Sequence, residues 1–139
     1  MVARGGGYPS RVLHHLTLWV PDLARARESW SWLLVELGYA PAPSIDGVVL
    51  FRHPVGFAVA LEQSADMVSG MLYSRFRPGV NHLAFRVASG GALTAIGDQA
   101  GEHGWTVLPG DRHAIAGGAE VIYLEDRDGF EVELVAPSA

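Results

Sequence analysis

One order of predicted elements occurs twice in this chain, and that repeat limits the folds it can adopt. Each half begins with an alternating, strand-like segment that contains a histidine, His15 or His82. An amphipathic helical stretch follows and ends at a glycine, Gly38 or Gly104. The histidine and the glycine are 23 residues apart in the first half and 22 in the second. Such a repeat predicts two copies of one supersecondary unit that pack together.

Each half also contains further strand-like segments after its helix. Asp22 and Ser89 are suited to begin the two helices, because their side chains can accept a hydrogen bond from the first helical turn. The best-defined later strands are predicted over residues 48–52, 57–62, 120–125 and 130–135. The predicted fold class is therefore α+β, with the order strand, helix and three strands in each half.

The length and composition favour one folded domain. The chain has 139 residues, of which 49% are hydrophobic and 18% charged, enough to build one core. We expect a disordered tail over residues 1–10 and a single domain over 11–136. Within that domain the first module covers about 11–62, a linker 63–79, and the second module about 80–136.

Several function classes are excluded by the residues that are absent. There is no cysteine and no lysine, so thiolate chemistry, disulfides and a Schiff-base lysine are excluded. The net charge is −5 and no basic stripe is visible, so we expect no nucleic-acid partner. No apolar run is long enough to span a membrane, and no signal peptide is visible, so we expect a cytoplasmic protein.

A histidine and a glutamate recur at similar spacing in the two halves. Glu62 follows His15 by 47 residues, and Glu133 follows His82 by 51. Alternation is consistent with all four side chains facing the same side of their strands. A lone histidine on a strand is usually structural, but a duplicated pair of this kind is typical of a metal site built by two modules.

Four segments in this order resemble the vicinal oxygen chelate superfamily, also called the glyoxalase/bleomycin-resistance/dioxygenase group. They are HLTLWVPDL (15–23), the helix that ends in LGY (37–39), VNHLAFRV (80–87) and YLEDRDGFEVELV (123–135). The resemblance implies two βαβββ modules that form a curved mixed sheet around a cleft. It also implies a homodimer, with the site either within one chain or shared between two.

The resemblance further implies a metal site and an activity. By position, the ligands of a divalent ion (Zn, Ni, Co, Mn or Fe) would be His15, Glu62, His82 and Glu133, with Glu62 or Glu133 as the catalytic base. Without Glu62, the other three residues form a set of two histidines and one carboxylate. The implied function is a lyase, isomerase or dioxygenase acting on a small oxygenated substrate. The alternative is a metal-free protein that binds a small molecule or antibiotic.

Other residues are weaker candidates. Trp19, Arg86 and Tyr123 occupy strand positions that would face the cleft, and we expect them to bind substrate; Arg86 could instead pair with Glu131. Arg75 is placed in the linker, which would make a natural flap; the alternative is an ordinary exposed loop residue. We expect exposure to solvent for His113, in the loop over residues 110–118, rather than contact with a substrate.

Overall fold

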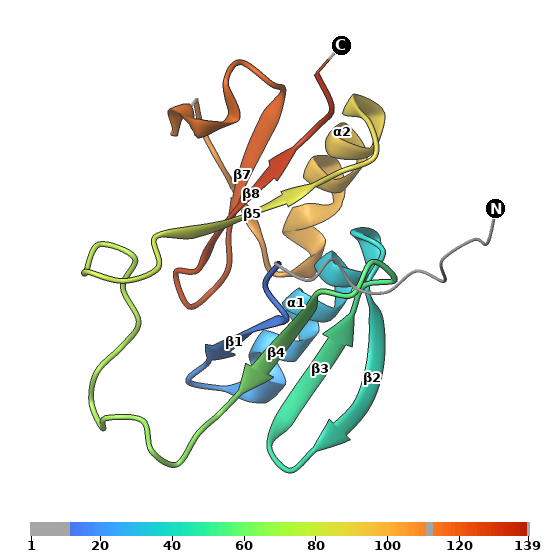
Figure 1. Ribbon diagram of the computed structural model, residues 1–139. Helices are drawn as coiled ribbons and strands as arrows, with labels where there is room; N and C mark the ends of the chain where they lie inside the picture. The colour runs from blue at the N-terminus through green and yellow to red at the C-terminus, as the bar shows by residue number, and fades with distance from the viewer. Residues whose placement is uncertain (1–11, 111–112, 139) are drawn as a thin grey trace, which may run out of the picture.

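The computed structural model describes residues 12–110 and 113–138 (Figure 1). The expected disordered tail, residues 1–10, lies outside the described residues. The chain forms two βαβββ modules joined by a long linker, which confirms the predicted fold class. Among the described residues, no helix is both long and apolar enough to cross a bilayer.

The first module is a four-stranded sheet with one helix. Its strands lie in the order β1-β4-β3-β2, with β1 and β4 parallel and the other neighbours antiparallel. The elements are β1 (His15–Trp19), α1 (Leu23–Glu36), β2 (Ala40–Ile45), β3 (Val48–Arg52) and β4 (Ala58–Glu62).

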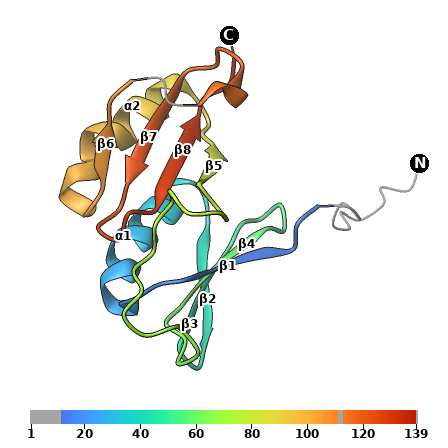
Figure 2. The ribbon, with the colours of Figure 1, turned by 90° about the vertical axis from the view of Figure 1, so that its left-hand side faces the viewer.

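The second module repeats this topology in a separate sheet with the order β5-β8-β7-β6, again with one parallel pair, β5 and β8. The elements are β5 (His82–Arg86), α2 (Gly90–Gln99), the 3₁₀ turn η1 (Ala100–His103), β6 (Thr106–Leu108), the 3₁₀ turn η2 (Ala114–Ala116), β7 (Val121–Glu125) and β8 (Glu131–Val135). One chain therefore contains two sheets rather than one continuous sheet (Figure 2).

Both helices begin, and α1 ends, as local chemistry predicts, whereas α2 ends at Gln99 and the 3₁₀ turn η1 continues the chain to Gly104. The Asp22 side chain accepts a hydrogen bond from the Arg25 amide at 3.0 Å, and Ser89 Oγ accepts one from the Ala92 amide at 3.1 Å. These bonds satisfy amides that have no partner within the helix. After α1 and after η1, Gly38 and Gly104 adopt φ of 90° and 84°, a left-handed conformation that favours glycine.

The two modules share one hydrophobic core, and helix α1 lies at their junction (Figure 2). Trp30 of α1 is fully buried, and its ring meets the ring of Trp105 edge to face, with centroids 5.0 Å apart. Its indole Nε1 donates a hydrogen bond to Asp126 Oδ2 of the β7–β8 turn at 2.9 Å. In return, Trp105 Nε1 donates to the Ser29 carbonyl at 2.9 Å. The first helix is thus fastened to the second module by two buried hydrogen bonds.

The Trp30–Asp126 bond yields a prediction about stability. We expect Trp30→Phe to lower the free energy of unfolding by about 2 kcal/mol, because a buried carboxylate oxygen loses its donor and the smaller ring leaves a void. Trp32→Phe is the matched control, since Trp32 is only partly buried and stacks on His103 at the surface of the same helix. Urea unfolding of both variants measures the difference, and equal losses would contradict this role of Asp126.

Asp126 also predicts a dependence of stability on pH. Burial raises the pKa of Asp126 above its usual value of 3.8, although bonds from Trp30, Phe130 and Asp128 oppose the rise. The folded state then holds this proton to a higher pH than the unfolded state does. As pH rises from below 3.8 through the raised pKa, wild type should therefore lose stability relative to Asp126→Asn. Unfolding of both proteins across this range tests the slope; a relative gain by wild type would contradict it.

Candidate functional site

The second sheet carries a cluster of polar side chains on the face away from α2. Strand register places Glu131 opposite His82, and Tyr123 opposite Glu133 on the next strand. Side chains alternate along a strand, so these four residues share one face, while Val132 and Leu134 point into the core. Arrangement on one face is what a site formed by several strands requires.

Two carboxylates of this face are buried, since Glu131 is 3% exposed and Glu133 is 2% exposed. Glu133 differs from Glu131 in its contacts. Its Oε2 lies 3.2 Å from His82 Nε2. Its Oε1 is buried and has no hydrogen-bond partner. An unpaired buried carboxylate oxygen costs free energy, so this atom is suited to a cation that the protein alone does not supply.

The ring of His82 is oriented to offer Nε2. Asn81 Nδ2 donates to the Arg75 carbonyl at 3.1 Å, which turns its Oδ1 toward His82, 2.8 Å from Nδ1. With a proton on Nδ1, the neutral ring presents the lone pair of Nε2 to the Glu133 carboxylate. Two electron-rich atoms 3.2 Å apart require a cation, either a second proton on the ring or a metal ion. Two ligands about 2.1 Å from one ion at a right angle are about 3 Å apart, so the pair fits a metal.

The first sheet lacks the corresponding carboxylate. The segment over residues 56–61 reads GFAVAL and the segment over 129–134 reads GFEVEL, so the two final strands align without a gap. The register agrees, because Ala60 lies opposite Thr17 just as Glu133 lies opposite Ala84. The counterpart of Glu133 in the first module is therefore Ala60, not Glu62.

Glu62 lies at the far end of its strand from His15. His15 is opposite Ala58, whereas Glu62 is opposite Trp19. Four residues of strand separate these positions by about 13 Å, which is too far for both side chains to bind one ion. The structure thus does not bring the expected four ligands together. Within residues 12–110 and 113–138, no three side chains of the ligating types converge on one point.

The expected substrate-binding residues are dispersed. Trp19 is 47% exposed at the end of β1, and Arg86 is exposed at the end of β5. Arg86 lies opposite Val135, four positions along the strand from the pair His82–Glu131. Tyr123 is buried beside Glu133, and its hydroxyl bonds to the backbone of His113. Of the three, Tyr123 alone lies beside Glu133 in the strand register.

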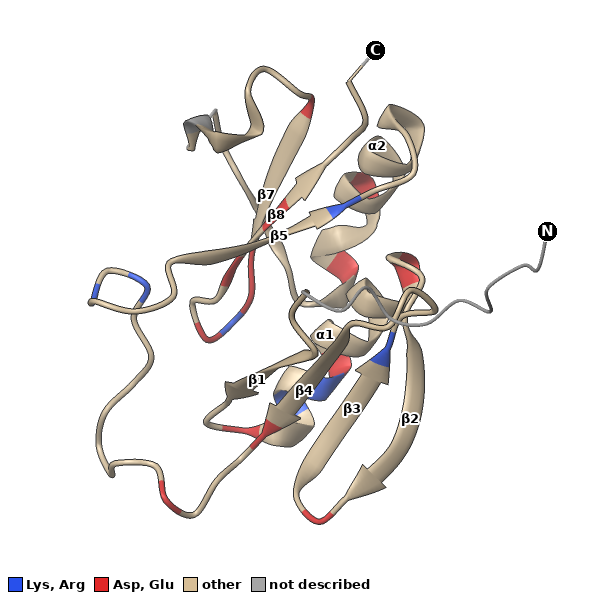
Figure 3. Ribbon diagram, viewed as in Figure 1, with Lys and Arg blue, Asp and Glu red and all other residues tan. Residues whose placement is uncertain are grey.

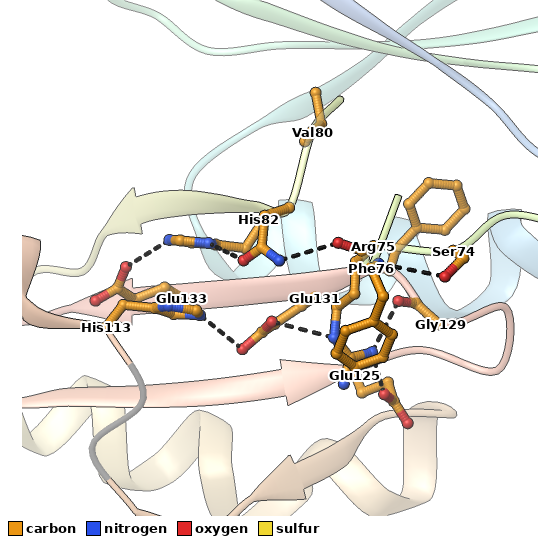
Figure 4. A network of polar contacts seen from close by, with 12 residues as sticks. Ser74, Arg75, Phe76, Val80, His82, His113, Glu125, Gly129, Glu131 and Glu133 are labelled. Atoms are coloured by element: carbon orange, nitrogen blue, oxygen red, sulfur yellow. Dashed lines mark hydrogen bonds and ion pairs between the residues drawn. The ribbon is translucent and has the colours of Figure 1, made fainter. Parts of the chain in front are cut away.

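Two further residues of this face come from segments where an exposed position is the ordinary outcome. The side chain of Arg75, in the linker, is instead nearly buried. Its Nη1 pairs with Glu125 and donates a hydrogen bond to the Gly129 carbonyl at 3.0 Å. Its Nε lies 3.3 Å from Glu131 Oε2. His113 is partly buried, and its Nε2 lies 3.2 Å from Glu131 Oε1 (Figure 4). No local motif marks either residue, because both contacts join segments far apart in the sequence.

The charges of the described residues are spread over both modules (Figure 3). Glu125 and Glu131 of the second sheet lie beside Arg75 of the linker, so this acidic group is partly neutralised within the chain. The polar face is therefore a mixed site rather than a strongly charged one.

A large apolar cavity lies apart from His82 and Glu133. Its volume is about 620 Å³ and it is bounded by the edges of β1 and β5, the end of α1 and the β3–β4 turn. Aromatic side chains of Tyr39, Phe57 and Phe85 contribute to its lining. Neither His82 nor Glu133 reaches it, so the chemistry of the polar face and this cavity are separate features.

Comparison with known proteins identifies the family. The family described as the glyoxalase/bleomycin resistance protein/dioxygenase superfamily matches residues 14–123. The chain belongs to this superfamily. The resemblance inferred from four sequence segments is thereby confirmed, and within the superfamily the paired βαβββ modules are the expected architecture.

Relatives of this superfamily member cover nearly its whole length. An uncharacterized protein of Bacillus subtilis, YqjT, is 35% identical over 128 residues, 91% of this chain and 99% of that protein. The crystal structure of a putative glyoxalase from Bacillus halodurans is 32% identical and superposes with a TM-score of 0.81, covering 92% of this chain and 97% of the other.

A more distant structure shares the fold. It is a point mutant of the fosfomycin resistance protein FosX from Listeria monocytogenes, in complex with Mn(II) and 1S,2S-dihydroxypropylphosphonic acid. Identity is 20% and the TM-score 0.62, over 91% of this chain and 90% of that one.

Proposed function

We propose that this protein is a metal-dependent enzyme of the superfamily that binds one divalent ion through His82 and Glu133. The observation that carries the proposal is the buried Oε1 of Glu133, which has no hydrogen-bond partner and lies on the carboxylate that faces His82 Nε2. The mixed nitrogen and oxygen donors suit Mn²⁺, Fe²⁺, Co²⁺, Ni²⁺ or Zn²⁺. FosX, a protein of the same fold, was crystallised with Mn(II).

We further propose that His15 of a second copy of the chain completes the site. His15 is exposed on β1, which pairs only with β4 among the described strands, and β5 likewise pairs only with β8. Each of these strands has an unpaired edge, and such edges tend to be covered. Pairing β1 of one chain with β5 of its partner would bring His15 toward His82 and Glu133, twice in a symmetric dimer.

The proposed ligand set differs from the one expected from the sequence. It omits Glu62, which lies opposite Trp19 rather than beside His15. The set becomes two histidines and one carboxylate, and Glu133 is retained as a ligand. When bound, the ion would supply Lewis-acid polarisation of an oxygen-bearing substrate. Asn81 would hold the His82 ring for binding, and Tyr123 would support the face on which the substrate lies.

The apolar cavity favours a second candidate function. Its volume of about 620 Å³ and its aromatic lining suit an apolar small molecule bound without a metal. In that case, binding of such a molecule would be unchanged in His82→Ala and Glu133→Gln. The metal-dependent proposal is preferred because it accounts for the unpaired oxygen of Glu133, which the cavity does not touch.

Metal titration tests the ligand set. We expect the metal-free protein to bind one equivalent of Mn²⁺ or Co²⁺ per chain in calorimetry. Glu133→Gln and His82→Ala should weaken binding by more than about a hundredfold, since losing even an outer hydrogen-bonding partner of a ligand costs about 10- to 100-fold. Glu62→Gln is the matched control and should bind as wild type does. Weakening by Glu62→Gln, or no binding by wild type, would overturn the proposal.

Mixed dimers test whether two chains share the site. His15→Ala and Glu133→Gln should each abolish metal binding when present in both chains. A heterodimer that joins one chain of each variant should regain one intact site, because its unmodified His15 and unmodified Glu133 lie at the same position. The control is His82→Ala mixed with Glu133→Gln, which leaves both shared sites damaged. Equal results from the two mixtures would show that the site is not shared in this way.

A further inference from the structure

His113 is stacked on the proposed ligand His82. The two imidazole rings are 4.0 Å apart and nearly parallel, with an interplanar angle of 8° (Figure 4). His113 reaches this position from the segment between β6 and β7, which is far from β5 in the sequence. The stack is therefore a contact between distant parts of the sequence that forms only when the second module is folded.

The backbone and the ring of His113 are both held in place. Its amide donates to the hydroxyl of Tyr123 at 3.1 Å, and the same hydroxyl donates to its carbonyl at 3.2 Å. Its Nε2 lies 3.2 Å from Glu131 Oε1, while the other oxygen of Glu131 lies 3.3 Å from Arg75 Nε. Tyr123 and Glu131 are themselves 1% and 3% exposed, so His113 is held by buried groups.

A parallel ring restrains the motion that matters for a histidine ligand. The lone pair of Nε2 lies in the plane of the imidazole, so rotation about the bond between Cβ and the ring swings it away from a bound ion. A second ring at 4.0 Å blocks that rotation on one side, and the Asn81 contact at Nδ1 fixes the ring edge. The Glu131 carboxylate favours a proton on Nε2 of His113, and the contact between them fixes one edge of the His113 ring.

We propose that His113 is a positioning residue that holds the plane of the His82 ring so that Nε2 faces the shared ion. This inference rests on the proposed metal-dependent function and adds a residue to its site. The chain offers a matched control, because His103 makes a similar stack on Trp32, at 4.4 Å and 7°, between η1 and α1.

The first test uses the metal-free protein and NMR of the histidine side chains. In wild type, the carbon-bound ring protons of His82 should be shifted upfield by the neighbouring ring. His113→Ala should remove that shift, and His113→Phe should retain it because an aromatic ring still stacks. His103→Ala should leave the His82 signals unchanged. If His113→Ala leaves them unchanged as well, the stack is absent and the inference is overturned.

The second test titrates Co²⁺ into the same proteins and records affinity and the visible absorption spectrum. We expect His113→Ala to raise the dissociation constant about tenfold, as loss of an outer partner of a ligand does. It should also alter the spectrum, whereas His113→Phe should restore both to near wild type. His103→Ala should bind as wild type. Wild-type affinity and spectrum in His113→Ala would overturn the positioning role.

The two tests separate this inference from the proposed function. Loss of the NMR shift together with unchanged Co²⁺ binding refutes only the role of His113. A wild type that shows the NMR shift but binds no Co²⁺ refutes the proposed function, and the positioning role with it. If His113→Ala does not fold, Tyr123→Phe replaces it, because that change removes the hydroxyl that binds the backbone of His113. Weakened Co²⁺ binding and a reduced NMR shift in Tyr123→Phe would then support the positioning role. Wild-type values of both would overturn it.

Discussion

The buried carboxylate of Asp126 is the interaction on which the position of the polar face depends. Its Oδ1 accepts hydrogen bonds from the amides of Asp128 and Phe130, both at 2.9 Å, and its Oδ2 accepts the bond from Trp30. One side chain therefore shapes the turn before β8 and ties that turn to α1. Because β8 starts directly after this turn, the register that sets Glu131 opposite His82 begins from a fixed point. The three donors offset part of the free energy lost by burying the charge, and burial still raises the pKa of Asp126.

Much of the fold could be predicted from the sequence because the signals that specify it are local. Ser89 caps the first turn of α2, and Gly104 adopts the left-handed conformation directly after η1, so both act on residues close to them in the chain. The alternation of apolar and polar residues indicated which side of each strand faces the core. The position of a side chain along a strand is a different matter. Glu62 has the alternation expected of a ligand, but only the register shows that it lies opposite Trp19. The aligned segments 56–61 and 129–134 contained the signal that would have pointed to Ala60.

The rest of the polar face could not be predicted, because it depends on contacts between distant segments. Arg75 belongs to a linker without regular periodicity, yet it is nearly buried against Glu131. His113 lies in a glycine-rich loop, where exposure to solvent is the common outcome, yet its ring stacks on that of His82 in β5. Both contact Glu131, which the sequence suggested only as a possible partner of Arg86. Contacts between charges and rings that are distant in the sequence depend on the tertiary structure, and no local sequence pattern indicates them.

The two sheets have matching apolar residues on the side that faces the core and different residues on the opposite side. This difference bears on how the sequence of such a chain can diverge. Val59 and Leu61 in one module, and Val132 and Leu134 in the other, occupy matching core positions. Between them, Ala58 and Ala60 in one sheet stand where Glu131 and Glu133 stand in the other. Residues that specify folding and residues available for chemistry thus alternate along the same strands but face opposite ways. One surface can diverge from copy to copy while the packing that supports it stays constant, so a duplicated scaffold can acquire new reactivity without being refolded.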